Sequence, residues 1–339
     1  MSKAPTRKQV ALEAGVSEAT VSRVYNRPNS VIAEKVERVK TAAQDLGYCP
    51  NKYASALRRN GSGVILFLER HYTDRYQWTQ LRHYNAFYAE IIRTLTKEAE
   101  KTLYHLRLQT VTSEKEILEI ATPAICDGII GFNFETEDSI NILVESELPY
   151  VCCHHTEGFK NANRVSTDNY SGGAIQANQL KKSGYDRPVY ITGALAETFS
   201  HQQRLAGFLS VYGKTSLQVI QVHPSIEGGQ QAGEQLVQAI RQSKIDSIGV
   251  VNDLTAIGII HALMRSGLEI PNDVGIIGYD NLPVINALPF QLTTIDLQLN
   301  RVYEKAFWSL LDVIQDQRQI TSKIKPILCA GESVKHNRV

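Results

Sequence analysis

The stretch from Gln9 to Asn26 is QVALEAGVSEATVSRVYN, and its pattern predicts two short helices joined by a tight turn. Small and apolar residues recur at helical spacing on both sides of the turn: Val10, Ala11 and Ala14 before it, and Thr20, Val21 and Val24 after it. Gly15 suits the positive-φ position after a helix, and Ser17 can cap the second helix. This pattern indicates a helix-turn-helix, and a plain helical hairpin in a small bundle is the alternative.

The second of these helices has a compact polar side that points away from the predicted core. Near its N-terminal end, where such helices meet the edges of DNA bases, the chain carries Ser17, Glu18, Ala19, Ser22, Arg23 and Asn26. We therefore expect these residues to form a DNA-binding surface.

Length and composition are typical of a soluble protein with several domains. The 339 residues favour two or three domains, and 43% of them are hydrophobic and 21% charged. No apolar run approaches the roughly 18–20 residues of a membrane span, and the N-terminus lacks the apolar core of a secretory signal. The five cysteines lack metal-ligand spacing. We expect a cytoplasmic protein with no cofactor, no metal and no membrane partner.

The basic residues are concentrated at one end of the chain. The net charge is only +1, but residues 1–60 hold eleven Lys or Arg against five Asp or Glu, so the rest of the chain is mildly acidic. A basic head on an acidic body is the asymmetry expected when only that end meets the phosphates of double-stranded DNA.

Two further segments follow the predicted helix-turn-helix. Residues 33–46 carry one apolar face and predict a third helix that closes a small core, which Gly47-Tyr48-Cys49-Pro50 ends. Residues 51–59 are short, amphipathic and basic, and Asn60-Gly61-Ser62-Gly63 is a natural domain boundary.

Residues 6–68 resemble the LacI/GalR (lac repressor type) family of bacterial transcription regulators. The matching residues are Val10-Ala11, Ala14-Gly15-Val16-Ser17, Thr20-Val21-Ser22-Arg23-Val24, Asn26, Gly47-Tyr48, Pro50-Asn51, Ala54 and Leu57-Arg58. The resemblance implies a DNA-binding head at 1–50, a hinge helix and linker at 51–62, and an effector-binding and dimerisation core at 63–339. In that family the hinge helix folds only on DNA. By this resemblance Leu57 enters the minor groove and kinks it, with Ala54 on the same face and Asn51 as a further contact.

The resemblance also implies which head residues select the DNA sequence. Glu18 and Ala19 occupy the positions that most determine operator choice, where Glu18 could accept from a cytosine amino group and Ala19 could contact a thymine methyl. Arg23 matches an arginine that can form two hydrogen bonds to guanine. Glu18 has an alternative role as a first-turn acid that the helix dipole stabilises. Ile32 stands where the family has a Ser or Thr cap, so a contribution of roughly 0.5–2 kcal/mol is missing or comes from Ser30.

From residue 64 onward, buried-strand runs alternate with helix-length segments, which predicts parallel sheets covered by helices on both faces. The expected strands are 64–68, 106–110, 128–132, 150–153, 189–193, 217–222, 248–251, 274–279 and 325–331. The clearest helices are 87–103, 171–183, 227–242 and 255–266. Because so many units exceed one sheet, we expect two doubly wound α/β lobes that face each other across a ligand cleft.

The resemblance implies the same architecture, which is that of periplasmic sugar-binding proteins. It places the first lobe at about 63–165 and 297–320, and the second lobe at about 166–296 and 321–333. The chain is then expected to cross between the lobes near 165, 296 and 320.

Six positions match effector contacts of the family: Phe87, Tyr88, His155, Arg204, Asn252 and Asp280. Arg204 lies in the matching hexapeptide QRLAGF, and Asn252 and Asp280 follow buried strands. Their amide, carboxylate and guanidinium groups offer donors and acceptors for vicinal hydroxyls, which favours a sugar. For each of these residues, a hinge or strand-end capping role is the alternative.

The segment 69–84 is longer than usual in the family and carries four large aromatic residues: Tyr72, Tyr76, Trp78 and Tyr84. Conversely, His223 occupies a position where some relatives have a stacking aromatic residue. We hypothesise that Trp78 or Tyr76 stacks on the ligand, and a surface or dimer-contact loop is the alternative.

Other site chemistries are not favoured. Cys152-Cys153-His154-His155 suggests zinc, but alternate residues of a strand face opposite sides, so these four side chains cannot converge on one ion. There is no GxSxG elbow, no phosphate-binding loop and no HExxH motif, so we do not expect an enzyme.

Together these features predict a ligand-responsive, sequence-specific DNA-binding regulator, most simply a repressor of carbohydrate-utilisation genes. One short recognition helix contacts few base pairs, so a homodimer on a pseudo-palindromic operator is expected. No leucine heptad follows the last predicted strand, which favours a dimer over a tetramer. A phosphoprotein corepressor or a nucleobase is the alternative effector. A sugar-binding transport protein is the alternative class, although it has no use for the first 60 residues.

Overall fold

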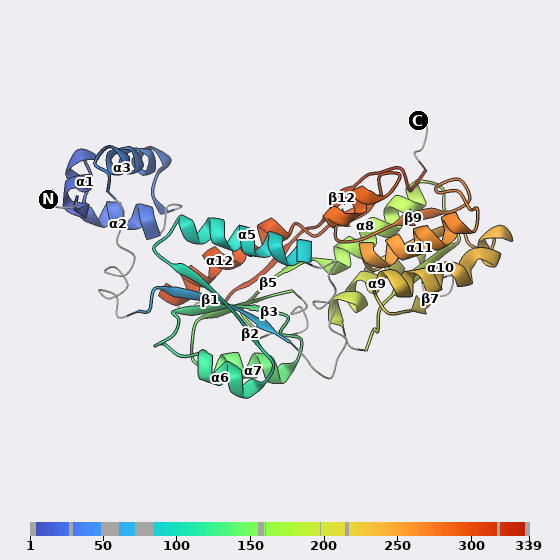
Figure 1. The fold of residues 1–339 in the computed structure, drawn as a ribbon, viewed down its shortest axis with the longest axis horizontal. Coiled ribbons are helices and arrows are strands. Elements are labelled where there is room, and N and C mark those ends of the chain that lie inside the picture. Colours follow the sequence, from blue (N-terminus) through green and yellow to red (C-terminus); the bar gives the residue numbers. More distant parts are fainter. Residues whose placement is uncertain are drawn as a thin grey trace.

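The computed structural model of the chain describes residues 5–26, 30–48, 61–71, 85–154, 159, 161–196, 198–213, 217–316 and 319–335. A small helical head comes first, and two α/β lobes follow it (Figure 1). The head lies at one end of the molecule beside the first lobe, and the C-terminus lies on the second lobe. The predicted helix-turn-helix head and two-lobed α/β core are confirmed.

Three helices form the head: α1 (Arg7–Glu13), α2 (Glu18–Asn26) and α3 (Ala33–Asp45). Thr6 begins α1 with a capping box, and the Ser17 hydroxyl accepts a hydrogen bond from the Thr20 amide at 3.1 Å at the start of α2. Gly15 has a φ of +60° in the turn between these helices. The three helices bury one small apolar core, whose most enclosed residues are Val10, Val21, Val24 and Val39.

The third helix of the head holds the turn in place. The Arg38 guanidinium of α3 donates to the carbonyl oxygen of Ala14 at 2.6 Å. Ile32 occupies the N-cap position of α3, is 62% exposed and contributes no side-chain hydrogen bond. Ile32 itself therefore supplies no cap, and a contribution from Ser30 stays a prediction.

The first lobe is built on a parallel six-stranded sheet with the order β11-β5-β4-β3-β1-β2. Its strands are β1 (Val64–Arg70), β2 (His105–Val111), β3 (Gly128–Phe132), β4 (Tyr150–Cys153), β5 (Arg164–Thr167) and β11 (Thr321–Ile324). One face is covered by α5 (Asn85–Glu100) and α12 (Leu299–Asp316), and the other by α6 (Glu114–Ile120) and α7 (Glu137–Glu145) (Figure 1). The central strands are buried on both faces, which explains their continuous apolar runs.

The second lobe is built on a parallel four-stranded sheet with the order β7-β6-β8-β9. Its strands are β6 (Pro188–Thr192), β7 (Gln218–Gln221), β8 (Ser247–Val250) and β9 (Gly275–Ile277). Its helices pack in two pairs, α8 (Asn169–Lys182) with α9 (Phe199–Tyr212), and α10 (Ile226–Arg241) with α11 (Asp253–Arg265). Gly173 and Gly207 allow α8 and α9 to approach so closely that a side chain at either position would clash with the facing backbone.

Three segments of chain connect the lobes, and hydrogen bonds hold them side by side. The Thr167 hydroxyl at the end of β5 donates to the Leu297 carbonyl at 2.9 Å, and the Asp168 amide donates to the Ile324 carbonyl at 2.9 Å. Beyond these bonds, β10 (Thr294–Asp296) pairs antiparallel with β12 (Ile327–Cys329). A short 3-10 helix, η4 (Pro283–Ala287), precedes β10. The three connecting segments therefore form one hinge that hydrogen bonds hold together, and we call it the tied hinge.

The lobe boundaries differ from those expected. Strand β5 pairs with β4 of the first lobe, so the first crossing comes after Thr167, within three residues of the expected position near 165. Strand β11 pairs with β5, so residues 321–324, expected in the second lobe, belong to the first. The single strand expected at 325–331 is only β12, because Pro326 has no amide hydrogen for a sheet and separates β11 from β12. Strand β1 extends to Arg70, so Glu69 is in the sheet and not in the predicted loop.

Within the part of the chain that the structure describes, no helix is both long enough and apolar enough to cross a membrane.

Candidate functional site

The predicted DNA-binding surface lies on the outer side of α2. Ser17, Ala19 and Arg23 are exposed there, and Ser22 is partly exposed. The core valines Val21 and Val24 fix the opposite side of the same helix. The exposed face is therefore positioned by packing, as contact with base edges requires.

Glu18 is held within the head. The Arg7 Nε donates to Glu18 Oε2 at 3.2 Å, and both side chains remain partly exposed. This pair links the first turn of α2 to α1, which agrees with the structural role given as the alternative for Glu18. Contact between Glu18 and a base stays a prediction. The side chain of Asn26, and all of Asn51, Ala54 and Leu57, lie outside the described residues.

The linker enters the first lobe at a defined anchor. Asp127, just before β3, accepts hydrogen bonds from the Ser62 hydroxyl at 2.8 Å and the Gly63 amide at 3.0 Å. The C-terminal end of the predicted hinge segment is thus fixed to the first lobe's sheet.

Arg204 is the centre of the second lobe's site and is 3% exposed. Its Nε donates to Asn169 Oδ1 at 2.8 Å, and its Nη1 donates to the Val251 carbonyl at 2.6 Å. Nη1 also lies 3.4 Å from Asp280 Oδ1, and the guanidinium carbon lies 3.9 Å from the centre of the Tyr279 ring. The predicted residues Arg204 and Asp280 are therefore brought together at the carboxyl ends of β8 and β9.

Asp280 lies in an environment that alters its acidity. It has a φ of +111°, which is rare for a residue other than glycine, and its amide donates to the Ile295 carbonyl at 2.8 Å. Burial raises the pKa of its carboxyl to about 7, although the nearby Arg204 charge opposes that rise. Near neutral pH this carboxyl can either accept or donate a hydrogen bond.

Asn252 caps a helix. Its Oδ1 accepts from the Thr255 amide at 2.9 Å, and its Nδ2 donates to the Pro224 carbonyl at 3.1 Å. This is the capping role that we gave as the alternative, and ligand contact by Asn252 stays a prediction.

The next residue, Asp253, is a part of the site that sequence reasoning missed. It is fully buried, accepts from the Thr294 hydroxyl at 2.6 Å and accepts from the Leu282 amide at 2.8 Å. It thereby fixes the loop that carries Asp280 to β10. A second polar residue directly after a buried strand was the available signal.

The first lobe contributes an aromatic wall. Phe87 and Phe132 lie against the His154 ring, with ring centres 5.2 and 5.8 Å away, and Tyr88 packs edge-on against Phe132. Burial and the neighbouring Glu69 raise the pKa of the Tyr88 hydroxyl. Phe87 and Tyr88 thus form the side of the lobe next to His154. The predicted His155, and the aromatic residues Tyr76 and Trp78, lie outside the described residues.

The Arg204 charge acts on two histidines, one from each lobe. Burial, with the Arg204 charge as the second cause, lowers the pKa of both His154 and His201 to about 3, and His154 adds to the effect on His201. The imidazoles of the first lobe's His154 and of α9's His201 are therefore close to the same guanidinium and uncharged at neutral pH. Sequence reasoning selected neither residue as an effector contact. Among the described residues, no group of three His, Cys, Asp or Glu side chains could hold a metal ion.

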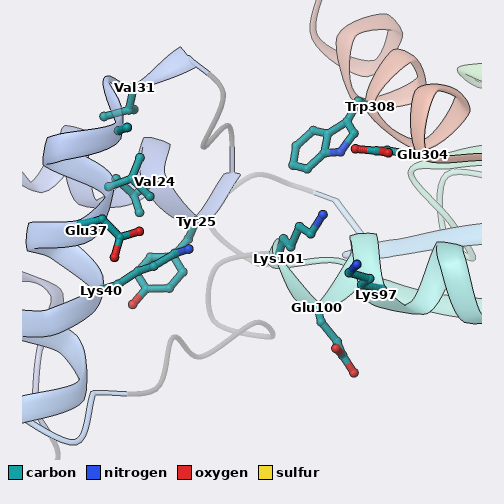
Figure 2. Close-up of a pocket in the computed structure, with 12 residues that line it drawn as sticks. Val24, Tyr25, Val31, Glu37, Lys40, Lys97, Glu100, Lys101, Glu304 and Trp308 are labelled. Carbon is teal, nitrogen blue, oxygen red and sulfur yellow. The ribbon is translucent and has the colours of Figure 1, made fainter. Parts of the chain in front are cut away.

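A separate open hollow of about 670 Å³ lies between the head and the first lobe. Figure 2 shows Tyr25 and Lys40 of the head on one side, and Lys97, Glu304 and Trp308 of the first lobe on the other. On the lobe side, the Trp308 indole donates to Glu98 at 2.9 Å. Lysines and glutamates alternate around this hollow, so it has no strong preference for either sign of charge.

Both parts of the chain match known families. Residues 6–51 match the model described as bacterial regulatory proteins, lacI family, and residues 177–334 match that of a periplasmic binding protein-like domain. The chain is 28% identical to the HTH-type transcriptional repressor PurR of Actinobacillus pleuropneumoniae over 98% of both chains. It is 29% identical to catabolite control protein A of Priestia megaterium over 84% of this chain and 85% of that protein.

A solved structure has the same core. The LacI family transcriptional regulator from Enterococcus faecalis with bound ribose covers 80% of this chain and 98% of its own, with a TM-score of 0.65 and 26% identity. The matching head, the matching core and the full-length relatives show that the chain belongs to the lacI family of bacterial regulatory proteins, which are DNA-binding regulators of transcription and not enzymes.

Proposed function

We propose that this protein is a cytoplasmic homodimeric repressor of carbohydrate-utilisation genes that binds a small neutral sugar between its lobes. The observation that carries the proposal is the buried Arg204–Asp280 pair at the carboxyl ends of β8 and β9, with Nη1 and Oδ1 3.4 Å apart. A forked donor next to a carboxyl acceptor suits the adjacent hydroxyls of a sugar. The ribose bound to the related Enterococcus faecalis regulator supports the same class.

A nucleobase is the second candidate effector. It is favoured by the aromatic wall of Phe87, Phe132 and His154, since flat rings stack on such surfaces. The two classes make different demands on the site. A sugar needs several hydrogen bonds around its edge, whereas a base needs a stacking partner and few directed groups.

The tied hinge gives ligand binding a route to the head. A ligand that bridges the lobes favours one arrangement of the hinge segments at Thr167, Leu297 and Ile324. Asp127 fixes the C-terminal end of the linker to the first lobe, so a change in lobe orientation moves that end of the linker in each protomer. In a dimer on a pseudo-palindromic operator, the spacing of the two heads changes with it. DNA affinity then changes by the ligand's differential affinity for the two arrangements.

The effector is tested by a thermal-shift panel of D-ribose, D-glucose, cellobiose, hypoxanthine and guanine on the full chain. We expect a neutral sugar to raise the melting temperature, and Asp280→Ala to abolish that shift. Glu234→Gln, an exposed change in the same lobe, serves as the control and should keep the shift. A shift that survives Asp280→Ala would place the ligand elsewhere, and a shift from bases only would favour the second candidate.

DNA binding is tested by fluorescence anisotropy on an operator selected from random DNA. The affinity should fall steeply as salt rises, because each neutralised phosphate releases counterions. The sugar found in the panel should change the affinity at fixed salt. An affinity that does not respond to salt would contradict binding through the basic head.

A further inference from the structure

Strand β6 carries two polar side chains where a buried strand normally has apolar ones. Its sequence is PVYIT, and Tyr190 and Thr192 are both fully buried. Residues two apart on a strand point to the same face of the sheet. The Tyr190 ring lies 4.8 Å from the Phe208 ring of α9, so both side chains lie on the α9 side.

The hydroxyl groups of these two residues have no hydrogen-bond partner within the described part of the chain. A buried hydroxyl without a partner is destabilising, and such groups in a native protein call for an explanation. Two such hydroxyls on the same face of one strand are harder to explain as an accident of packing than a single one would be.

The strand leads to the Arg204–Asp280 pair. The Tyr190 ring packs against Phe208, which follows Arg204 by one turn of α9, so Tyr190 lies on the Arg204 side of the sheet. Thr192 is nearer than Tyr190 to the carboxyl end of the strand, where ligands of parallel sheets bind.

His201 lies over the end of the same strand. A β-carbon built on Gly193 would lie 2.8 Å from His201 Nδ1, so the ring rests on the backbone directly after Thr192. Arg204 follows His201 by three residues on α9, which places both on one face of that helix. Thr192 therefore lies next to the backbone that His201 covers, His201 lies one helical turn from Arg204, and Tyr190 lies two residues back on the same face of the strand.

We propose that Tyr190, Thr192 and His201 form a deep polar subsite that receives a hydroxyl or hydroxymethyl group of a neutral polyol effector. The inference rests on the proposed function and extends the site inward from Arg204 and Asp280.

The charges around the proposed subsite favour a neutral ligand group over an anionic one. The Nε and Nη1 donors of Arg204 bond Asn169, Val251 and Asp280, so its positive charge is already paired with the Asp280 carboxyl and is not left for an anion. Of the other acids facing this region, Asp253 is bonded by Thr294 and Leu282. The imidazoles of His154 and His201 are uncharged at neutral pH. A buried carboxylate or phosphate at this depth would lose its hydration without a compensating charge.

Near-isosteric variants test the subsite. Tyr190→Phe and Thr192→Val remove only the two hydroxyls, and calorimetric titration of the full chain measures the affinity for whichever of D-ribose, D-glucose and cellobiose gives the largest thermal shift. Each variant should bind that sugar about 3- to 10-fold more weakly, the loss of one hydrogen bond. Its melting temperature without sugar should stay unchanged or rise, since an unpaired buried hydroxyl is gone. Thr192→Ser keeps a hydroxyl and should restore part of the affinity.

Ser309→Ala is the matched control. Ser309 is also a buried hydroxyl without a partner among the described residues, but it lies on α12 of the first lobe. This variant should leave the sugar affinity unchanged. If Tyr190→Phe and Thr192→Val behave like Ser309→Ala, the hydroxyls are only unsatisfied core groups and the proposal is overturned.

Two further outcomes separate the subsite from the proposed function. D-Glucuronate, which carries a carboxylate where D-glucose has a hydroxymethyl group, should bind more weakly than D-glucose, and tighter binding would overturn the neutral class. If none of the three sugars shifts the wild-type melting temperature, the proposed sugar-responsive function itself fails. A sugar that binds the wild type and both variants equally removes only the subsite.

Discussion

Helix α2 of the head and the Arg204 cluster of the second lobe place their predicted functional side chains in opposite ways. On α2 the functional residues are exposed, come from one short helix and rest on a core of small valines. At Arg204 the polar residues are buried and come from α8, α9, β8 and the turn after β9. The head can therefore lose a functional side chain without losing stability, whereas the lobe cannot.

The largest expected effect is that of Arg204→Met. It leaves Asp280 buried without its charged partner, which costs about 3–5 kcal/mol of unfolding free energy when the carboxyl is ionised. Without Arg204 the pKa of Asp280 rises further above its present value of about 7. Chemical denaturation should therefore show a loss at pH 8 that exceeds the loss at pH 6 by about 1 kcal/mol, because the carboxyl is largely protonated in both proteins at pH 6 and loses its proton above pH 7 only in the wild type. Equal losses at the two pH values would show that packing, and not the ion pair, is responsible.

Arg23→Ala tests the other side of the comparison. Arg23 is exposed on α2, so its loss should leave the melting temperature unchanged while it weakens operator binding by about 1–3 kcal/mol. Anisotropy on the selected operator and on a variant operator measures both affinity and specificity. An equal loss on all DNA sequences would indicate a phosphate contact, and a lower melting temperature would break the comparison.

His154 and His201 predict an acid response that comes from the lobes and not from the head. Their pKa values are about 3 in the folded chain and about 6.5 when unfolded, so the unfolded chain binds more protons between those values. Their contribution to stability is present above pH 6.5 and is lost as the pH falls. Asp280, raised from 3.8 to about 7, acts in the opposite direction in that window, since the folded chain then holds the extra proton.

His201→Gln removes one of the two histidine contributions. Between pH 6 and pH 4 the variant should lose less unfolding free energy than the wild type, by about 1 kcal/mol per pH unit, as urea denaturation can measure. The same dependence on pH in both proteins would show that His201 is not held uncharged in the folded state.

The smallest expected effect lies in the head. Ile32→Asp adds an N-cap to α3 and should stabilise this helix by about 1 kcal/mol. Hydrogen exchange of the α3 amides in the full chain should slow accordingly. Ile32→Ala, which removes the exposed side chain without adding a cap, is the control, and equal protection in both variants would contradict the missing-cap explanation.

The head could be predicted from the sequence because its determinants are local. Ser17 caps α2 three residues before the amide that it bonds, and Gly15 adopts its positive φ between two helices of known period. The strands of the core were also predictable, since β1, β3 and β4 are buried on both faces and so have continuous apolar runs. The sheet to which each strand belongs was not predictable. Nothing in the local sequence shows that β11 pairs with β5 and that β12 pairs with β10.

The effector site was predictable only in part. Arg204 and Asp280 matched a family pattern, but the bonds of Arg204 to Asn169, Val251 and Asp280 join residues 35, 47 and 76 positions apart. We predicted His155 and not His154 as an effector contact. The sequence gives the order of residues, but it does not show that His154, directly after β4, has a φ of +66°. Tyr190 and Thr192 gave a faint signal as polar residues in a buried strand.

The sequence by itself determined the helix-turn-helix, the basic head, the alternation of strands and helices, and the family, since each depends on spacing within a few tens of residues. Only the tertiary structure decided that β11 joins the first lobe, that Asp253 holds the Asp280 loop, and that the Arg204 charge acts on two histidines from opposite lobes. The physical reason is that burial, charge pairing and orphaned hydroxyls depend on which distant segments pack together.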